Sequence, residues 1–212
     1  LCHNLSYKNS FDKKILKKLN IFPDNNPYIK QIFSLLIYGK FVPSAVICHI
    51  SLENKKQIIE KINDNNLFLL NEKDIQTFHN VKKEVKLMVE TSVPLNICRN
   101  TKVLGFRPTD GSADHFAFIF NSGEKNQTPL IRIHSQCITG DLFNSLKCDC
   151  GSQLNEAIKI LSKKNGILLY MSQEGRDIGF LNKLRAYSFQ ENGLNTIEAN
   201  NAIGFKADHR NF

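Results

Sequence analysis

The second half of the chain alternates between short apolar segments and longer segments whose apolar residues recur with helical spacing. Residues 115–120 (HFAFIF) and 129–134 (PLIRIH) have the composition of β-strands, and we predict that they are neighbouring strands joined by a polar loop. Residues 166–171 (GILLYM) form a short apolar run that is typical of a buried strand. This alternation restricts the second half to a sheet covered by helices.

Two helices are predicted between and after these strands. Residues 152–163 carry apolar side chains at helical spacing, and Ser152 is a candidate N-cap. Residues 178–192 form the second predicted helix, which ends before Gly193, where a left-handed residue commonly stops a helix. We therefore predict an α+β (mixed α/β) fold, with a mixed sheet flanked by helices in the second half.

The first half contains no chemical motif and is rich in Lys, Asn, Ile and Leu. Its candidate elements are helices at residues 13–19 and 54–62 and strands at residues 44–50 and 66–70. Turn-forming residues accumulate over residues 91–111. We predict a smaller α/β region over residues 1–92 without a catalytic motif, followed by a catalytic domain over residues 93–212.

The composition is that of a globular protein. Apolar residues make up 42% of the chain and charged residues 23%, and no run approaches the roughly 18 apolar residues of a membrane span. The formal net charge of +8 would suit a phosphate-rich ligand or nucleic acid. Nucleic-acid binding would favour aromatic residues among the basic ones, and the lysine cluster at residues 13–18 contains none. We therefore expect neither nucleic acid nor a membrane as partner.

Three of the six cysteines lie within fourteen residues, and the other three are scattered. A disulfide framework would be shorter, richer in cysteine and more evenly spaced. The pattern therefore favours the reducing cytoplasm, and the first residues show no signal peptide. Residue 1 is not methionine, so we expect the chain to be a piece of a longer protein.

The clustered cysteines have the chemistry of a metal site. Cys137 is followed by ten residues, then Cys148, one residue and Cys150. Three thiolates suit Zn²⁺, and a site with three protein ligands keeps its fourth position for a water molecule, as catalytic zinc sites do. Spacing alone leaves two alternatives open: ordinary loop cysteines, or a structural site completed by His134.

Several polar motifs accompany the cysteines in a fixed order. They are RIHSQCITGD at residues 132–141, SLKCDCG at 145–151, QEGR at 173–176, NKLRAY at 182–187, TIEAN at 196–200, GF at 204–205 and DHR at 208–210. Together these motifs resemble the zinc segment of the GTP cyclohydrolase II family, and the resemblance covers roughly residues 93–212. Residues 1–92 resemble the divergent N-terminal extension of some alphaproteobacterial members.

The resemblance implies a reaction. Members of the family bind one Zn²⁺ per subunit and hydrolyse GTP at the entrance to riboflavin biosynthesis. They open the imidazole ring of guanine, with loss of C8 as formate and release of pyrophosphate, to give a diaminopyrimidinone ribosyl phosphate. The family uses Mg²⁺ with the triphosphate and is commonly homodimeric.

The resemblance also implies roles for individual residues. The matches to the zinc ligands are Cys137, Cys148 and Cys150. The matches to the catalytic residues are Asp208 as proton acceptor, Arg210 as the nucleophile and Tyr187 near the reacting centre. The matches to the GTP contacts are Arg132, Ile133, His134, Ser135, Gln136, Gln153, Glu174, Gly175, Arg176 and Thr196.

These residue types suit the implied reaction. Glu174 beside Gly175 can accept hydrogen bonds from guanine while the backbone approaches closely, and Arg176 offers a planar fork for phosphate oxygens. A guanidinium stays protonated in ordinary surroundings, so a phosphate clamp is the plainer physical role for Arg210. Taken singly, each motif would be an ordinary turn, helix face or surface ion pair, and only their joint order favours a site.

Two features depart from the family pattern. Gln136 stands where the family usually has Glu, and the chain ends two residues after Arg210 although the family continues. We therefore expect a chain truncated at both ends, whose isolated form is weakly active or inactive. The rival functions are a non-catalytic zinc-stabilised nucleotide-binding module, a basic zinc module that binds nucleic acid, and a cyclohydrolase that stops at a formylated pyrimidine.

Overall fold

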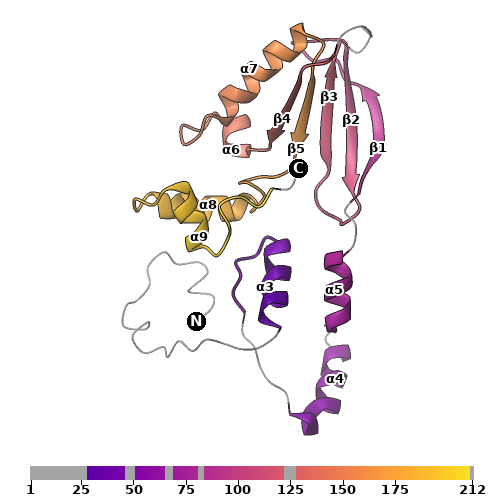
Figure 1. The fold of residues 1–212 in the computed structure, drawn as a ribbon, viewed down its shortest axis with the longest axis vertical. Helices are drawn as coiled ribbons and strands as arrows, with labels where there is room; N and C mark the ends of the chain where they lie inside the picture. Colours follow the sequence, from indigo (N-terminus) through magenta and orange to yellow (C-terminus); the bar gives the residue numbers. More distant parts are fainter. Residues whose placement is uncertain (1–27, 46–50, 65–68, 81–83, 122–127, 211–212) are drawn as a thin grey trace. The chain divides into compact units, whose positions relative to one another are not determined.

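The chain divides into two compact units, residues 1–82 and 83–212. The computed structural model describes residues 28–45, 51–64, 69–80, 84–121 and 128–210 (Figure 1). The division falls before the predicted boundary at residues 92 and 93, because strand β1 (Val85–Ser92) pairs inside the second unit.

In the described part of the first unit, the secondary structure is helical. Its elements are α3 (Ile29–Tyr38), the 3₁₀-helix η1 (Leu52–Asn54), α4 (Lys55–Asp64) and α5 (Glu72–Asn80). Helix α4 confirms the helix predicted over residues 54–62. The helix predicted at residues 13–19 lies outside the described residues, as do most of the two predicted strands, and the described residues of those strands belong to no strand.

Several apolar side chains in the described part of the first unit are exposed, among them Phe41 and Leu69. The ring of Tyr38 packs edge-on against Phe78, with centroids 4.7 Å apart, and so links two of its helices. None of the side chains described in this unit is buried. The apolar face of α3 is therefore only half covered, with Phe33 at its edge still 36% exposed.

A five-stranded mixed sheet forms the frame of the second unit, as predicted (Figure 1). The strands that join β1 are β2 (Thr101–Pro108), β3 (His115–Phe120), β4 (Ile131–Ser135) and β5 (Ile167–Met171). Their order across the sheet is β1-β2-β3-β5-β4, and only β4 and β5 run parallel. Strand β3 covers the same residues as its prediction.

The predicted adjacency of β3 and β4 is wrong, because β5 lies between them. Ala117 of β3 pairs with Leu169 of β5, and Leu169 pairs in turn with Ile133 of β4. Strands β4 and β5 are parallel, so the chain must cross over between them, and a helix makes that crossover. The crossover inserts β5 beside β3.

Helix α7 (Cys150–Lys163) makes the crossover and covers one face of the sheet. It begins earlier than predicted: Asp149 occupies the N-cap position, and the Ser152 hydroxyl donates to the Asp149 carbonyl at 2.8 Å. The core beneath it is apolar and tightly closed. Its buried members are Cys98, Phe120, Leu161 and Leu168, flanked by Leu95, Phe118, Leu154, Ala157 and Ile158.

Three further helices complete the second unit: α6 (Ile138–Asp141), α8 (Phe180–Gln190) and α9 (Thr196–Ala202). The predicted second helix is confirmed as α8, and Gly193 beyond its end has the expected left-handed backbone, with φ of 93°. Helix α9 begins with a capping box between Asn195 and Glu198. In the described residues no helix combines the length and apolar character needed to span a bilayer.

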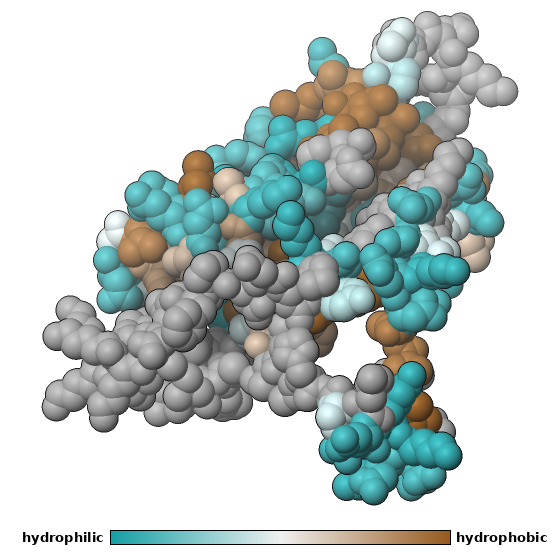
Figure 2. All heavy atoms as spheres, turned by 60° about the horizontal axis from the view of Figure 1, so that its bottom comes forward, coloured by the Kyte–Doolittle hydropathy of each residue, from teal (hydrophilic) through white to brown (hydrophobic). Residues whose placement is uncertain are grey.

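Apolar side chains also reach the surface of the second unit. All of β1 is exposed, and Leu87 and Val89 are each more than half accessible. The space-filling view shows apolar surface gathered over the sheet (Figure 2).

Candidate metal centre and nucleotide site

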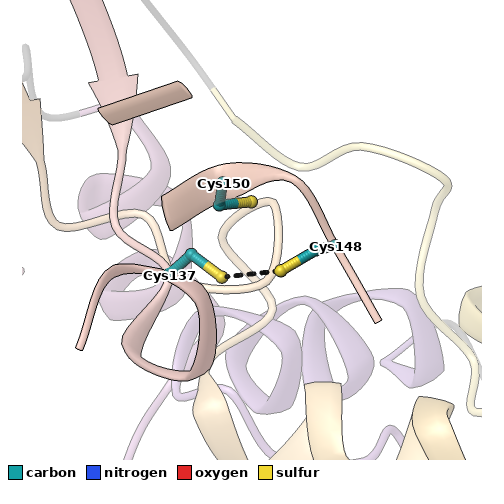
Figure 3. A group of neighbouring side chains, drawn as sticks. All are labelled: Cys137, Cys148 and Cys150. Carbon is teal, nitrogen blue, oxygen red and sulfur yellow. Dashed lines mark hydrogen bonds between the residues drawn. The ribbon is translucent and has the colours of Figure 1, made fainter. Parts of the chain in front are cut away.

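Three cysteine sulfurs converge where β4 ends and α7 begins (Figure 3). Cys137 is the N-cap of α6, Cys148 lies in the loop that follows, and Cys150 is the first residue of α7. All three sulfurs lie within 4.8 Å of one another, and those of Cys137 and Cys148 are 3.6 Å apart. The backbone thus brings the predicted ligands to one point.

The geometry fits a zinc ion. Tetrahedral zinc with sulfur ligands at about 2.3 Å places two sulfurs about 3.8 Å apart, close to the observed spacing. Gly140 leaves the space that the sulfurs occupy: a Cβ there would lie 3.0 Å from both Cys137 Sγ and Cys148 Sγ. A Cβ on Gly151 would collide with the Gly140 carbonyl oxygen. Both glycines are therefore required for the close approach of the two turns.

The three thiols are not equivalent. Burial tends to raise the pKa of Cys137, but hydrogen bonds from Lys183, Thr139 and the Gly140 amide outweigh it, and the pKa is lowered. Burial, together with the neighbouring Cys137 sulfur, raises the pKa of Cys150 to about 12. Cys137 is therefore ionised more readily than Cys150, and it contacts a lysine.

A buried polar network lies behind Cys137. The Asp141 carboxylate accepts hydrogen bonds from the Cys137 amide at 3.0 Å and the Tyr170 hydroxyl at 2.7 Å. His134 Nε2 lies 3.1 Å from the same carboxylate, and both side chains are under 5% exposed. Burial and the bond to Asp141 raise the pKa of Tyr170. The network fixes the backbone at the start of α6.

Glu174 and Lys183 form an ion pair on the other side of Cys137. Lys183 Nζ lies 2.8 Å from Glu174 Oε1 and 2.9 Å from Cys137 Sγ. Glu174 Oε2 accepts from the Ile138 amide at 2.7 Å, and Oε1 also accepts from the Gly175 amide. Glu174 therefore already holds the cysteine turn before any ligand binds.

The turn after Glu174 has an unusual backbone. Gly175, Arg176 and Asp177 all have left-handed conformations, with φ of 63°, 60° and 71°. Such conformations cost non-glycine residues roughly 1 kcal/mol or more and collect at functional sites. The Arg176 guanidinium donates to the Ala207 carbonyl at 3.2 Å, and the Arg176 carbonyl accepts from the His209 amide. The turn therefore ties the QEGR segment to the DHR segment.

Most of the predicted site residues line one open cavity of ≈ 280 Å³. Its predicted members are Ser135, Gln136, Cys137, Cys148, Cys150, Glu174, Gly175, Arg176, Tyr187, Thr196 and Arg210. The backbone amide of Gln136 donates to the Met171 carbonyl at 2.8 Å, which fixes the backbone of Gln136 at the end of β5. Segments far apart in the sequence therefore meet around one space beside the thiols.

The other predicted GTP contacts border a second cavity of ≈ 270 Å³, which shares Ser135, Cys150 and Arg210 with the first. Its remaining lining residues are Arg132, Ile133, His134 and Gln153. The Arg132 guanidinium donates to the Gln153 side chain at 3.1 Å.

Asp208 lines neither cavity, but it forms an ion pair with Arg210, which lines both. The two side chains form an ion pair at 2.6 Å, and Arg210 also donates to the Ser135 hydroxyl at 3.3 Å. The hydrogen bond from Arg210 lowers the pKa of Asp208, and the same bond raises the pKa of Arg210. Both groups are therefore ionised at neutral pH.

Among the residues around the thiols, Asp141, Tyr170 and Lys183 received no role from the sequence. Asp141 and Lys183 stand inside the quoted motifs, but their partners lie elsewhere in the chain. The sequence did contain one local indication for Lys183. It is four residues from the predicted site residue Tyr187, so both side chains share a face of α8. Lys183 Nζ lies 5.7 Å from the centre of the Tyr187 ring.

A mixed α+β unit with three thiols at the wall of a cavity that also carries arginine, lysine and glutamate side chains is typical of a metal-binding enzyme domain. A family model for GTP cyclohydrolase II matches residues 86–212. The chain therefore belongs to the GTP cyclohydrolase II family, and the two glycines that shape the thiol site lie within the match.

Individual relatives agree with this assignment. The chain is 38% identical over 174 residues to the GTP cyclohydrolase-2 of Azospirillum brasilense, across 81% of this chain and 45% of that relative. It is 46% identical over 136 residues to the GTP cyclohydrolase-2 of Aliivibrio fischeri (strain MJ11), across 63% and 65% of the two chains. The riboflavin biosynthesis protein RibBA of Cytophaga hutchinsonii is 38% identical over 182 residues, across 81% and 44%. The chain thus spans about half to two thirds of the length of these relatives.

Proposed function

We propose that the protein hydrolyses GTP with the help of zinc and opens the imidazole ring of guanine. C8 leaves as formate, the terminal phosphates leave as pyrophosphate, and a diaminopyrimidinone ribosyl phosphate remains as a precursor of riboflavin. The observation that carries this proposal is the convergence of three sulfurs beside a cavity lined by the arginines and the glutamate of the family motifs.

Cys137, Cys148 and Cys150 would hold the zinc ion. When bound, zinc makes a water molecule nucleophilic near neutral pH, which suits attack on the electron-poor C8 of guanine. The remaining groups of the cavity position the nucleotide. Mg²⁺ is the proposed partner of the triphosphate, because phosphate oxygens are among its usual ligands in proteins.

Arg210 is proposed as a phosphate clamp. Its raised pKa keeps the guanidinium charged, which removes the lone pair that a nucleophile needs. Asp208 holds this cation in place and is the proposed proton acceptor during ring opening. Arg176, which lines the same cavity, supplies a second planar donor for phosphate oxygens.

Glu174 is proposed to contact guanine through Oε2 alone. A carboxylate offers about four lone-pair positions, and Oε1 already accepts from Lys183 and Gly175. Oε2 accepts from Ile138 and keeps one position for a donor on the base. Glu174 would therefore hold both the guanine base and the cysteine turn.

Product analysis tests the proposed reaction. The full-length protein is incubated with GTP, Mg²⁺ and Zn²⁺, and formate and pyrophosphate are quantified together with the remaining GTP. Equal amounts of formate and pyrophosphate are expected. Consumption of GTP without formate would indicate a formylated product instead. Binding of GTP without turnover would indicate a non-catalytic module, and salt-dependent binding of oligonucleotides a nucleic-acid partner.

The proposal also includes a homodimer in the cytoplasm. The scattered cysteines suit a reducing compartment. Sedimentation of the purified protein at several concentrations tests the dimer, and a monomer at all of them would contradict it.

A further inference from the structure

Lys183 is a buried cation in contact with a candidate metal ligand. The residue is 8% exposed, and its ammonium lies 2.9 Å from Cys137 Sγ and 2.8 Å from Glu174 Oε1. Lysine is almost never buried unless its charge is paired, because taking the charge out of water costs several kcal/mol. The two contacts on Lys183 are therefore specific features of the site.

The surrounding backbone directs Lys183 to this position. Helix α8 begins after Gly179, and the Lys183 amide donates to the Gly179 carbonyl in its first turn. The left-handed turn packs directly against this helix: a Cβ on Gly175 would lie 3.0 Å from Lys183 Cβ. A glycine is thus required for the lysine stem to pass beside Glu174.

Glu174 and Lys183 act on the same cysteine turn from two directions. Lys183 contacts the sulfur of Cys137, and Glu174 accepts from the amide of Ile138, the next residue. The side chain and the backbone of the turn are therefore both fixed by one ion pair. Tyr187, on the same face of α8, has its ring centre 5.7 Å from Lys183 Nζ.

The charges around the metal position also require a cation. Three thiolates outnumber the two positive charges of a zinc ion, and the Glu174 carboxylate adds a further negative charge in a poorly hydrated place. We propose that Lys183 is a positioning residue of the metal centre, which holds the Cys137 sulfur and offsets the excess negative charge. This inference rests on the proposed zinc site. Residues that support metal ligands in this way commonly contribute 10- to 100-fold to affinity.

Two substitutions that break the same ion pair separate this role from a merely structural one. Lys183→Met removes the cation and leaves the Glu174 carboxylate beside the sulfur. Glu174→Gln leaves the cation beside the sulfur and keeps an acceptor for the Ile138 amide. Zinc affinity is measured for both by competition with a chelator. We expect Lys183→Met to weaken zinc binding about 10- to 100-fold, and Glu174→Gln to change it less than about threefold.

Further variants keep the test decisive. Lys183→Arg should restore most of the affinity, because it retains the charge. Lys147→Met is the control for charge alone: Lys147 lies 5.1 Å from the same Tyr187 ring, but its side chain is 44% exposed and pairs with Glu191. It should change zinc affinity less than about twofold. If Lys183→Met does not fold, Lys183→Gln replaces it, since an amide keeps a hydrogen-bond donor without charge.

The outcomes can be told apart. Equal losses of affinity in Lys183→Met and Glu174→Gln would mean that the ion pair only supports the fold, and the inference would be overturned. Unchanged affinity in Lys183→Met would overturn it as well. Absence of zinc binding in the unsubstituted protein would overturn the proposed function and this inference together. The absorption of cobalt bound in place of zinc gives a second readout, because cobalt–thiolate bands change when a sulfur is displaced.

Discussion

The two units of the chain differ in how they place their apolar side chains. In the first unit, the described helices leave every described side chain at least partly exposed. In the second, α7 closes over the sheet, and Phe120 and Leu161 are each only 1% exposed. The candidate chemistry lies entirely in the second unit. The sulfurs of Cys137 and Cys148 lie within a few tenths of an ångström of the spacing that zinc requires, and a closed core provides the rigid support that such a placement needs.

The largest expected difference between the units concerns cysteine. In the full-length protein, Cys148→Ser replaces a thiolate by a poor zinc ligand, so zinc content should fall to background and formate release should drop at least about 1000-fold. Cys48→Ser, in the first unit, should leave both unchanged. Metal analysis and the formate assay measure the effect. Equal losses in the two variants would place the metal chemistry outside the proposed cluster.

The next largest difference is expected when an apolar side chain in each unit is truncated to alanine. Leu161→Ala removes a fully buried side chain and should lower the free energy of unfolding by about 3 kcal/mol. Leu36→Ala in α3 truncates a half-buried side chain and should cost about 1 kcal/mol or less. Urea denaturation followed by circular dichroism gives both values. Comparable costs would show that the first unit has a core as tight as that of the second.

Two glycines test how rigid each unit is. A Cβ on Gly140 would lie 2.8 Å from Cys150 Cβ, and one on Gly39 would lie 2.9 Å from the Phe41 ring. Gly140→Ala must push against the metal ligands, so zinc affinity should fall about tenfold, or about 1.4 kcal/mol. Gly39→Ala meets a ring that is 65% exposed and free to rotate away, so stability should change by less than about 0.5 kcal/mol. Chelator competition and urea denaturation give the two values.

The smallest effect concerns pH at the end of the second unit. Because Arg210 lowers the pKa of Asp208, the pair stabilises the fold above the unfolded pKa of about 3.9. This contribution is lost as the pH falls through the lowered pKa. Asp208 is 43% exposed, so solvent screening keeps the effect below about 1 kcal/mol. Asp208→Asn should be less stable than the unsubstituted protein at pH 7 and equally stable near pH 2, as measured by urea denaturation.

The sequence predicted the local elements of the second unit well, because each has a strong pattern of its own. Strand β3, strand β5 and helix α7 all lie within a few residues of their predictions. The three thiols are also close in sequence, so their convergence could be predicted without knowing the tertiary fold. In the first unit, α5 carries few apolar residues in its nine-residue span, and its periodicity gave no usable signal.

Long-range partners could not be predicted in the same way. The position of β5 between β3 and β4 depends on a crossover, and no pattern in the three strands encodes it. Lys183 is 46 residues from Cys137, and Tyr170 is 29 residues from Asp141. These pairs follow from the tertiary fold. The residues that surround the predicted ligands were therefore harder to find than the ligands themselves.

All three sulfurs come from one short stretch between β4 and α7. Binding an ion there closes a small loop of chain, and the entropy of closing a loop depends only weakly on its length. The strands and the apolar core lie outside this loop. Removing the metal with a chelator should therefore loosen only this turn and leave the sheet intact. The apoprotein should remain folded and able to bind metal again.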